Sequence, residues 1–169
     1  MRVPWLFLAA WVLVLGVLLL GGEGRGKDIE VRVLLSRTQG EISCSSPWGL
    51  EVRLGKRVFT IPSRRSVSFL FSPSGVLWKE KSIAAPVVTV RPKGEVVYFG
   101  KRPYRGYLEI RKKKENLEVI NVLSLEDYLK GTAKLEANPS WPEEALKAWI
   151  VVARTYALKN LGRHREEGF

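Results

Sequence analysis

Glu136 is the residue whose type and surroundings first suggest chemistry. It stands between Leu135 and Ala137, just before the turn-forming run NPSWP at residues 138–142. A carboxyl group among apolar neighbours resists ionisation, and a carboxyl that stays protonated near neutral pH can act as a general acid. The sequence therefore predicts a buried acid/base residue at Glu136, beside this turn.

A long amphipathic helix is predicted directly after the turn. Ser140 can cap its N-terminus, with Glu143 three residues later as the second member of a capping box. Pro142 suits the first helical turn, where a missing backbone N–H costs little. Apolar residues recur at helical spacing, so one face is expected to lie in the core: Leu146, Trp149, Ile150, Ala153, Tyr156, Ala157 and Leu161.

A short helix is predicted before Glu136, and strands before that helix. Ser124 and Asp127 have the spacing of an N-cap, and Gly131 can end the helix. Further upstream, short apolar or alternating runs between Gly- and Pro-containing turns indicate strands. They are Ile29–Leu35, Val52–Leu54, Val58–Ile61, Val67–Phe71, Val76–Trp78, Val88–Val90, Val96–Phe99, Tyr107–Arg111 and Leu117–Leu123.

Four of the intervening turns are expected to close hairpins: Gly55-Lys56, Ser72–Gly75, Pro92–Gly94 and Lys112–Asn116. The fold class is therefore α+β, with a β-rich body of short antiparallel strands followed by a short helix and a long amphipathic helix. Residues 28–95 are assigned to a β-rich module and residues 96–169 to the part that carries Glu136. The boundary is placed near Gly94–Gly100.

The N-terminal residues predict a membrane segment. Val3–Leu20 is an uncharged, almost wholly apolar run that follows Arg2. Its length lies between that of a signal-peptide core and that of a short transmembrane helix. We assign residues 1–22 to a signal or membrane anchor, with a retained anchor favoured over a cleaved signal, and residues 23–27 to a linker.

The charge and the reactive residues narrow the classes of function. The formal net charge is +11, which favours a polyanionic partner but equally serves solubility. The basic residues are scattered and no recognition motif accompanies them, so nucleic acid is not an expected partner. The chain has a single cysteine, Cys44, and a single histidine, His164, and this pair makes no metal-ligand pattern. We therefore expect no metal site and no cofactor.

The run LEANPSWPEEALKAWIVVARTYAL, at residues 135–158, resembles the signature of the SpoIID/LytB family, which is roughly EMPxSWPxEALKAQAxAARTYAL. The matched positions are Glu136 and residues 140–142, 144–148 and 153–157, without a gap. LSLEDYLKG at residues 123–131 is similar to the approach to that signature. The chain departs from it at Ala137-Asn138, where the family has Met-Pro, and at Trp149, where the family has Gln.

The resemblance implies a lytic transglycosylase that acts on peptidoglycan glycan strands, with Glu136 as its catalytic acid/base. One carboxyl can protonate the leaving sugar oxygen and later accept the proton of the attacking 6-hydroxyl. A hydrolase would ordinarily need a second carboxylate. Glu126, Asp127, Glu143 and Glu144 are available for that role.

Four further residues are candidates for substrate binding. Trp141 and Tyr156 can stack on sugar rings, although either can instead pack in the core. Arg154 can pair with Glu136 or with a substrate carboxylate. Ser140 lies next to Trp141 in the sequence, and its hydroxyl either binds the substrate or only caps the helix.

Two functions stay open at this point. The first is a peptidoglycan lytic transglycosylase of cell-wall remodelling, related to sporulation and anchored in the membrane with its body outside. The second is a non-catalytic module of the same family that binds the cell wall or enhances an amidase. The family pattern continues with a DTTxCQ-type segment after the point where this chain stops, so the resemblance predicts an incomplete domain. Glu136 favours the first function, whereas Trp149 and the short chain favour the second.

Overall fold

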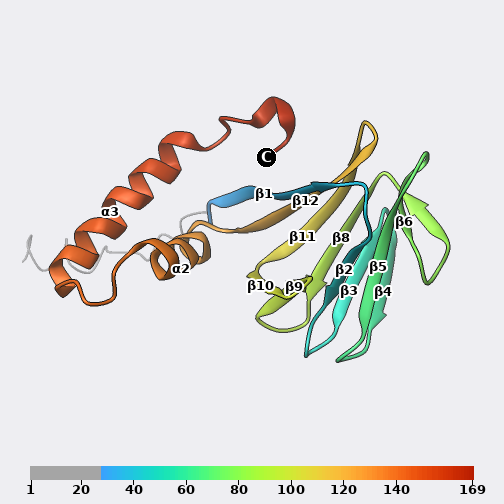
Figure 1. The fold of residues 1–169 in the computed structure, drawn as a ribbon, viewed down its shortest axis with the longest axis horizontal. Coiled ribbons are helices and arrows are strands. Elements are labelled where there is room, and N and C mark those ends of the chain that lie inside the picture. Colours follow the sequence, from blue (N-terminus) through green and yellow to red (C-terminus); the bar gives the residue numbers. More distant parts are fainter. Residues whose placement is uncertain (1–27) are drawn as a thin grey trace, which may run out of the picture.

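The computed structural model describes residues 28–169. These residues form a β-sandwich from which a helical hairpin projects (Figure 1). The predicted anchor, residues 1–22, and the predicted linker, residues 23–27, lie outside the described residues. Within residues 28–169, no helix is long and apolar enough to cross a membrane.

Two antiparallel six-stranded sheets make up the sandwich. The first has the order β1 (Glu30–Thr38), β12 (Asn116–Ser124), β11 (Tyr107–Lys113), β8 (Val87–Pro92), β3 (Leu50–Leu54) and β4 (Arg57–Ile61). The second has the order β10 (Arg102–Arg105), β9 (Val96–Phe99), β2 (Ile42–Ser45), β5 (Ser66–Ser72), β6 (Gly75–Trp78) and β7 (Ile83–Ala85). The predicted β-rich, α+β character is confirmed.

The inner faces of the two sheets share one core. Alternate residues of the strands point inward, as the period of two requires, and the largest of them are Phe69 and Trp78, which are 0% and 1% exposed. The ring of Phe59 packs edge-on against Trp78 at 5.0 Å between centroids. Cys44 lies in the same core, where burial raises the pKa of its thiol to about 12. A thiol with so high a pKa is a poor nucleophile at neutral pH.

Three of the four predicted hairpins are confirmed. β3 pairs with β4, β5 with β6, and β11 with β12. The fourth prediction, a hairpin across Pro92–Gly94, is wrong because β8 pairs with β3 and β11 whereas β9 pairs with β2 and β10. The Pro-Gly turn carries the chain from one sheet to the other, and local turn chemistry does not reveal that.

This same connection contains the expected boundary between residues 95 and 96. Strands from the two sides of it pair with each other in both sheets: β8 pairs with β11, and β2 pairs with β9. Both sides also contribute to the shared core. The structural division therefore falls at the end of β12, where the sandwich gives way to helices.

The first helix, α2 (Leu125–Glu136), follows β12 without a loop. The Ser124 hydroxyl oxygen accepts a hydrogen bond from the Asp127 N–H at 3.1 Å, so the predicted N-cap is confirmed. The helix does not end at Gly131 but continues to Glu136. A helical glycine costs about 1 kcal/mol relative to alanine, and good helix formers on both sides of Gly131 outweigh that cost.

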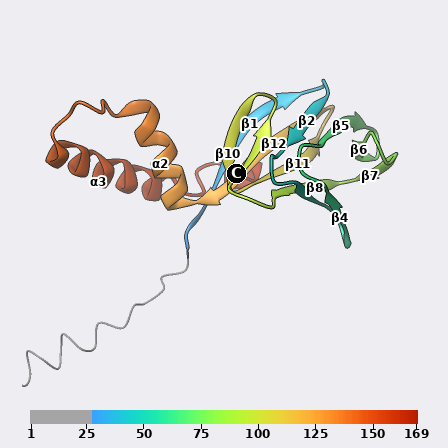
Figure 2. The same ribbon diagram turned by 90° about the horizontal axis from the view of Figure 1, so that it is seen from below.

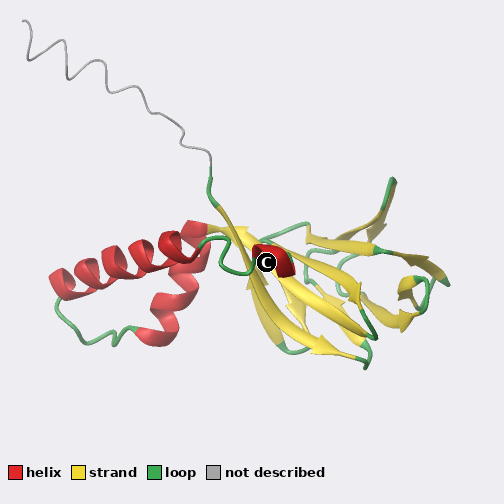
Figure 3. Ribbon diagram, turned by 90° about the horizontal axis from the view of Figure 1, so that it is seen from above, coloured by secondary structure: helices red, strands yellow, loops and turns green. Residues whose placement is uncertain are grey.

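The second helix, α3 (Glu143–Asn160), returns towards the sandwich, and a short 3₁₀ turn (Arg165–Glu167) follows. The hairpin of α2 and α3 extends away from the sheets, with its connecting loop at the far end (Figures 2 and 3). Leu125 and Leu129 of α2 pack on Val31 of β1 and contact Ala153 and Ala157 of α3. This small cluster attaches the hairpin to the sandwich.

The prediction that α3 buries a full apolar face is only partly right. None of its residues is fully buried. Ala153 and Ala157 meet the cluster on α2, and Trp149 and Ile150 are half-buried, but Tyr156 is 65% exposed. The predicted apolar face of α3 is therefore wider than the surface of α2 and β1 that packs against it.

Candidate functional site

Glu136 is the last residue of α2, and its side chain is exposed. Its neighbour Leu135 is 86% exposed. Within the described part of the chain, Glu136 forms no ion pair and no side-chain hydrogen bond. The prediction of a carboxyl enclosed by apolar groups is therefore wrong, because neighbours in sequence cannot cover a side chain at a free helix end.

The loop after Glu136 is a tight turn organised by Asn138. The Asn138 side-chain oxygen accepts a hydrogen bond from the Ser140 N–H at 2.9 Å and another from the Ser140 hydroxyl. The Trp141 N–H donates to the Asn138 carbonyl oxygen at 3.0 Å. These bonds hold Ser140 and Trp141 in a defined geometry close in sequence to Glu136.

Ser140 is not the N-cap of α3. Pro142 takes that position, and its carbonyl oxygen accepts hydrogen bonds from Ala145 at 2.9 Å and Leu146 at 3.1 Å. The Ser140 hydroxyl donates to Asn138 instead, and no side chain of residues 28–169 caps the helix. Glu143 and Glu144 lie in the first turn, as predicted, and both pair with Lys147.

Arg154 pairs with Glu126, not with Glu136. Its two terminal nitrogens contact the two carboxylate oxygens of Glu126, one of them at 2.8 Å. The hydrogen bonds from Arg154 lower the pKa of the Glu126 carboxyl. Glu126 and Glu136 lie at opposite ends of α2, about 15 Å apart along the helix axis, so Arg154 ties α3 to α2 at the sandwich end of the hairpin.

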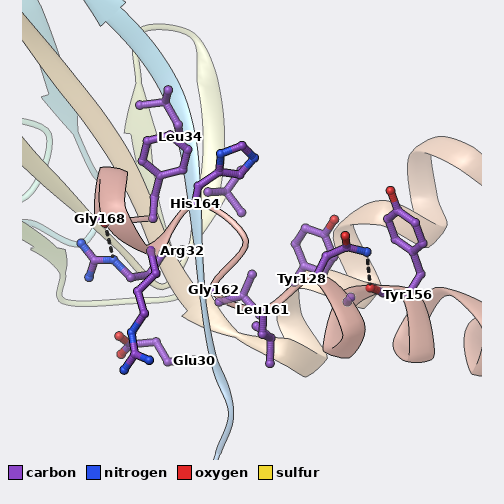
Figure 4. A pocket seen from close by; sticks show the side chains of 15 residues that line it. Glu30, Arg32, Leu34, Tyr128, Tyr156, Leu161, Gly162, His164 and Gly168 are labelled. Carbon is purple, nitrogen blue, oxygen red and sulfur yellow. Dashed lines mark hydrogen bonds between the residues drawn. The ribbon is translucent and has the colours of Figure 1, made fainter.

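Tyr156, two residues after Arg154 in α3, lines a pocket of about 750 Å³ (Figure 4). One wall is β1, the second is formed by Tyr128 and the end of α3, and the third is the C-terminal turn. The predicted site residues thus fall into two groups. Glu136, Ser140 and Trp141 share the loop end of the hairpin, whereas Arg154 and Tyr156 lie nearer the sandwich.

The C-terminal turn rests against the first sheet through basic side chains that the sequence analysis did not single out. Arg32 donates to the Gly168 carbonyl oxygen at 3.1 Å, and Lys113 donates to that of Glu167 at 3.1 Å. The Glu167 carboxylate pairs with Arg37 at 2.7 Å. Together these contacts hold the C-terminal turn, which forms the third wall of the pocket, against the first sheet.

Glu118 is the buried centre of this basic cluster and is only 1% exposed. It accepts hydrogen bonds from Arg37 at 2.7 Å and from Arg111 at 2.9 and 2.7 Å. Burial alone would raise the pKa of the Glu118 carboxyl, but the two arginines outweigh burial and lower it. The sequence did indicate a buried ion pair at this position. Glu118 interrupts an otherwise apolar strand, and a charge that is buried in a strand needs a partner of opposite charge.

The histidine and cysteine are far apart in the fold. His164 is exposed, stacks on Phe169 and lies 3.2 Å from Glu167, whereas Cys44 is in the sandwich core. Across residues 28–169 there is no group of three or more His, Cys, Asp and Glu side chains placed to hold a metal ion.

The C-terminal third of the chain, which contains the helical hairpin, is similar to a known protein family. The sequence profile of the SpoIID family, described as stage II sporulation protein, matches residues 113–169. This segment of the chain is a SpoIID-family sequence. In the structure, it comprises β12, the helical hairpin and the C-terminal turn. The SpoIID segment therefore contains Glu136 and all four predicted substrate-binding residues, while most of the sandwich lies outside it.

An uncharacterized protein of Brachyspira hyodysenteriae (strain ATCC 49526 / WA1) is 45% identical to this chain over 58 residues. The match covers 34% of this chain and 16% of that relative, so it spans about a sixth of the curated relative's length. No solved structure matches the chain.

Proposed function

We propose that this chain cleaves peptidoglycan glycan strands as a lytic transglycosylase in sporulation-related cell-wall remodelling, with Glu136 as the acid/base residue. The observation that carries the proposal is the SpoIID match over residues 113–169, which includes Glu136 and the turn beside it. The geometry supports it in one respect: the Glu136 carboxyl is accessible at the outer end of the hairpin, where an extended polymer can reach it.

The proposed reaction breaks the bond from C1 of N-acetylmuramic acid to O4 of N-acetylglucosamine. Glu136 donates its proton to the leaving O4, and the 6-hydroxyl of the same muramic acid residue attacks C1. The proton of that hydroxyl returns to Glu136, and the product carries a 1,6-anhydro end. A sugar stacked on Trp141 would displace water from the Glu136 carboxyl.

The four other predicted site residues take different roles in this proposal. Ser140 and Trp141 contact the sugar beside Glu136. Arg154 acts as a positioning residue, because its pair with Glu126 links α3 to α2 beside the apolar cluster that holds the two helices together. Tyr156 contacts a more distant part of the glycan strand from the pocket beside β1.

Glu136→Gln tests the proposal in the full-length chain. The amide keeps the size of the side chain but has no proton to give, so we expect glycan cleavage to fall by about 10²- to 10⁴-fold. Glu143→Gln is the matched control, because Glu143 is an equally exposed carboxylate in the next helix. The assay digests purified glycan strands and weighs the products for 1,6-anhydro ends. Undiminished cleavage by Glu136→Gln refutes the role.

A second candidate is a non-catalytic module that binds wall glycan or enhances a cell-wall amidase. The observation that favours it is the set of exposed apolar side chains around the hairpin, Leu135, Trp141, Val151 and Val152, which a partner protein or glycan could cover. Glycan binding or amidase stimulation by an intact chain that itself releases no 1,6-anhydro product would establish this candidate instead.

The proposed location is the cell envelope, with residues 3–20 in the cytoplasmic membrane and the body outside it. The apolar run and the SpoIID match support this location. Protease added to intact spheroplasts should digest the body while a cytoplasmic marker survives. Full protection of the body, with digestion only after lysis, would refute it.

A further inference from the structure

Three loops meet beside β3 and β4, at the same strand end of the first sheet as the start of α2 but near the opposite edge of that sheet. They are residues 46–49, 62–65 and 93–95. The Ser46 carbonyl oxygen accepts hydrogen bonds from Gly49 at 3.2 Å and Arg64 at 3.3 Å, and the Lys93 N–H donates to the Gly49 carbonyl oxygen at 3.0 Å. The backbone therefore fixes these loops to one another.

Trp48 lies on this loop cluster and is 51% exposed. Its indole ring lies against Gly94, where a Cβ atom would come within 2.5 Å of the ring. The bare backbone of Gly94 thus supports the ring and leaves the rest of it open to solvent. A large aromatic side chain held in this way on a fixed loop contributes little to the core and is available for a ligand.

Basic side chains accompany Trp48 on the same loops. Arg64, Arg65 and Lys93 are all exposed, and none of them forms an ion pair within residues 28–169. Arg64 also has a φ of 60°, an unusual conformation for a residue other than glycine. The acidic residue on these loops is Glu95, so the cluster keeps an excess of positive charge.

We propose that Trp48, Arg64, Arg65 and Lys93 form a binding site for an anionic polysaccharide. A pyranose ring presents an apolar C–H face that can stack on the indole, and its carboxylate or phosphate groups can pair with the basic side chains. Proteins that bind single-stranded nucleic acid use a series of aromatic platforms, whereas these loops offer a single one. The site lies outside residues 113–169, so it does not depend on the activity proposed for Glu136.

The first test compares four polymers with the full-length chain in detergent, by calorimetry at low and at physiological salt. Alginate carries sugars and charge, dextran carries sugars alone, polyphosphate carries charge alone, and single-stranded DNA offers bases. We expect alginate to bind at least about tenfold more tightly than the other three. Absence of alginate binding, or equal or tighter binding of polyphosphate or DNA, would overturn the proposal.

The second test moves Trp48 without removing it. Gly94→Ala must displace the indole ring, and the φ of Gly94 lies outside the left-handed region, so the backbone tolerates alanine. Gly131→Ala is the matched control, because a Cβ there meets no atom within 4 Å. Gly94→Ala and Trp48→Ala should each weaken alginate binding about tenfold, with melting curves to show that both variants fold. Unchanged affinity in both variants would refute a role for the ring.

The third test concerns the charges. Arg65→Gln with Lys93→Gln should weaken alginate binding and reduce its dependence on salt. Lys56→Gln with Arg57→Gln removes the same charge from the β3–β4 turn, where both side chains are exposed, and should leave the affinity within about twofold. Equal losses from the two double variants would show that net charge alone attracts the polymer, and would refute the site.

Discussion

The sandwich and the helical hairpin differ sharply in how they are buried. In the sandwich, both sheets contribute residues with no exposed surface, including Phe69, Leu108 and Ile110. In the hairpin, Leu125 and Leu129 are the buried residues and α3 has none. Yet the hairpin belongs to the segment that matches the SpoIID family, whereas most of the sandwich does not.

This difference separates stability from candidate function. A segment with few buried apolar contacts opens locally at a lower free energy than the core of the same protein. The hairpin depends on one small apolar cluster, on the Arg154–Glu126 ion pair between its helices and on a longer contact of Asp127 with Arg105 in β10. It carries Glu136 at its outer end. We therefore expect mutations in the sandwich to act on global unfolding and mutations in the hairpin to act on local opening.

The largest effect is expected from Phe69→Ala. Phe69 has no exposed surface and packs against Trp78, so its truncation should lower the global free energy of unfolding by about 3–5 kcal/mol. Urea denaturation followed by fluorescence measures this. Val58→Ala, at a half-exposed position on β4, should change it by less than about 0.5 kcal/mol. Similar losses from both variants would show that the sandwich core is not close-packed.

The next largest effect is expected from Leu129→Ala. The Leu129 side chain, on α2, is buried against α3 and β1. Its truncation should therefore destabilise the hairpin by about 2–4 kcal/mol. Hydrogen exchange should accelerate across α2 and α3 while the sandwich strands stay protected. Leu135→Ala, on an exposed residue of the same helix, should leave exchange unchanged. Faster exchange throughout the sandwich would mean that the two regions unfold together.

Glu118→Gln examines the contact between the sandwich and the C-terminal turn. Removal of the charge weakens the hydrogen bonds from Arg37 and Arg111, which should cost about 1–3 kcal/mol at neutral pH. Folding lowers the pKa of the Glu118 carboxyl. The contribution of its charge to the free energy of unfolding is therefore complete above the pKa that the carboxyl has in the unfolded chain. It is lost as the pH falls through the lower pKa of the folded state.

Thermal melts between neutral and acidic pH measure that dependence. The wild-type chain should lose stability on acidification below about pH 5, and Glu118→Gln should lose less. Glu115→Gln removes an exposed carboxylate from the neighbouring turn and should behave as wild type. A variant curve parallel to that of the wild-type chain would show that Glu118 is not the titrating group.

The smallest effect is expected from Arg154→Gln. Its pair with Glu126 is partly exposed to water, and such pairs contribute little to stability. Hydrogen exchange at the junction of α2 and α3 should rise slightly, by less than in Leu129→Ala. Lys159→Gln, which removes an exposed charge from the same helix, should have no effect there. An effect larger than that of Leu129→Ala would mean that the ion pair, not the apolar cluster, holds the hairpin.

Local chemistry explains which features could be predicted. The hairpin turns at Gly55-Lys56, Ser72–Gly75 and Lys112–Asn116, and the cap of α2 at Ser124, depend on residues within a few positions of one another. A turn or cap of this kind is stabilised by its own backbone and side chains. The start of α3 near Pro142 was predicted for the same reason, although the residue that caps it was not.

Contacts between distant residues explain the failures. The pairing of β8 and β9 depended on which sheet each strand joined, and Arg154 pairs with Glu126 although Glu136 was equally available in sequence. The Ser140 cap is the exception, because Asn138, only two residues away, binds the Ser140 hydroxyl instead. The loop cluster around Trp48 had no signal of its own. Ser46, Arg64 and Lys93 are far apart along the chain, and only hydrogen bonds between their loops bring them together.

The sequence by itself determined most of the strands, the two helices of the hairpin, most of the turns and the SpoIID motif around Glu136, because periodicity, turn chemistry and motif spacing are properties of short segments. The short strands β2, β7 and β10 were not predicted. The tertiary structure alone decided burial. It left Glu136 in water at a free helix end, and it enclosed Glu118 between two arginines under the C-terminal turn. Whether a carboxylate is exposed or buried depends on which surfaces fold over it, and those surfaces come from parts of the chain that its neighbours in sequence do not specify.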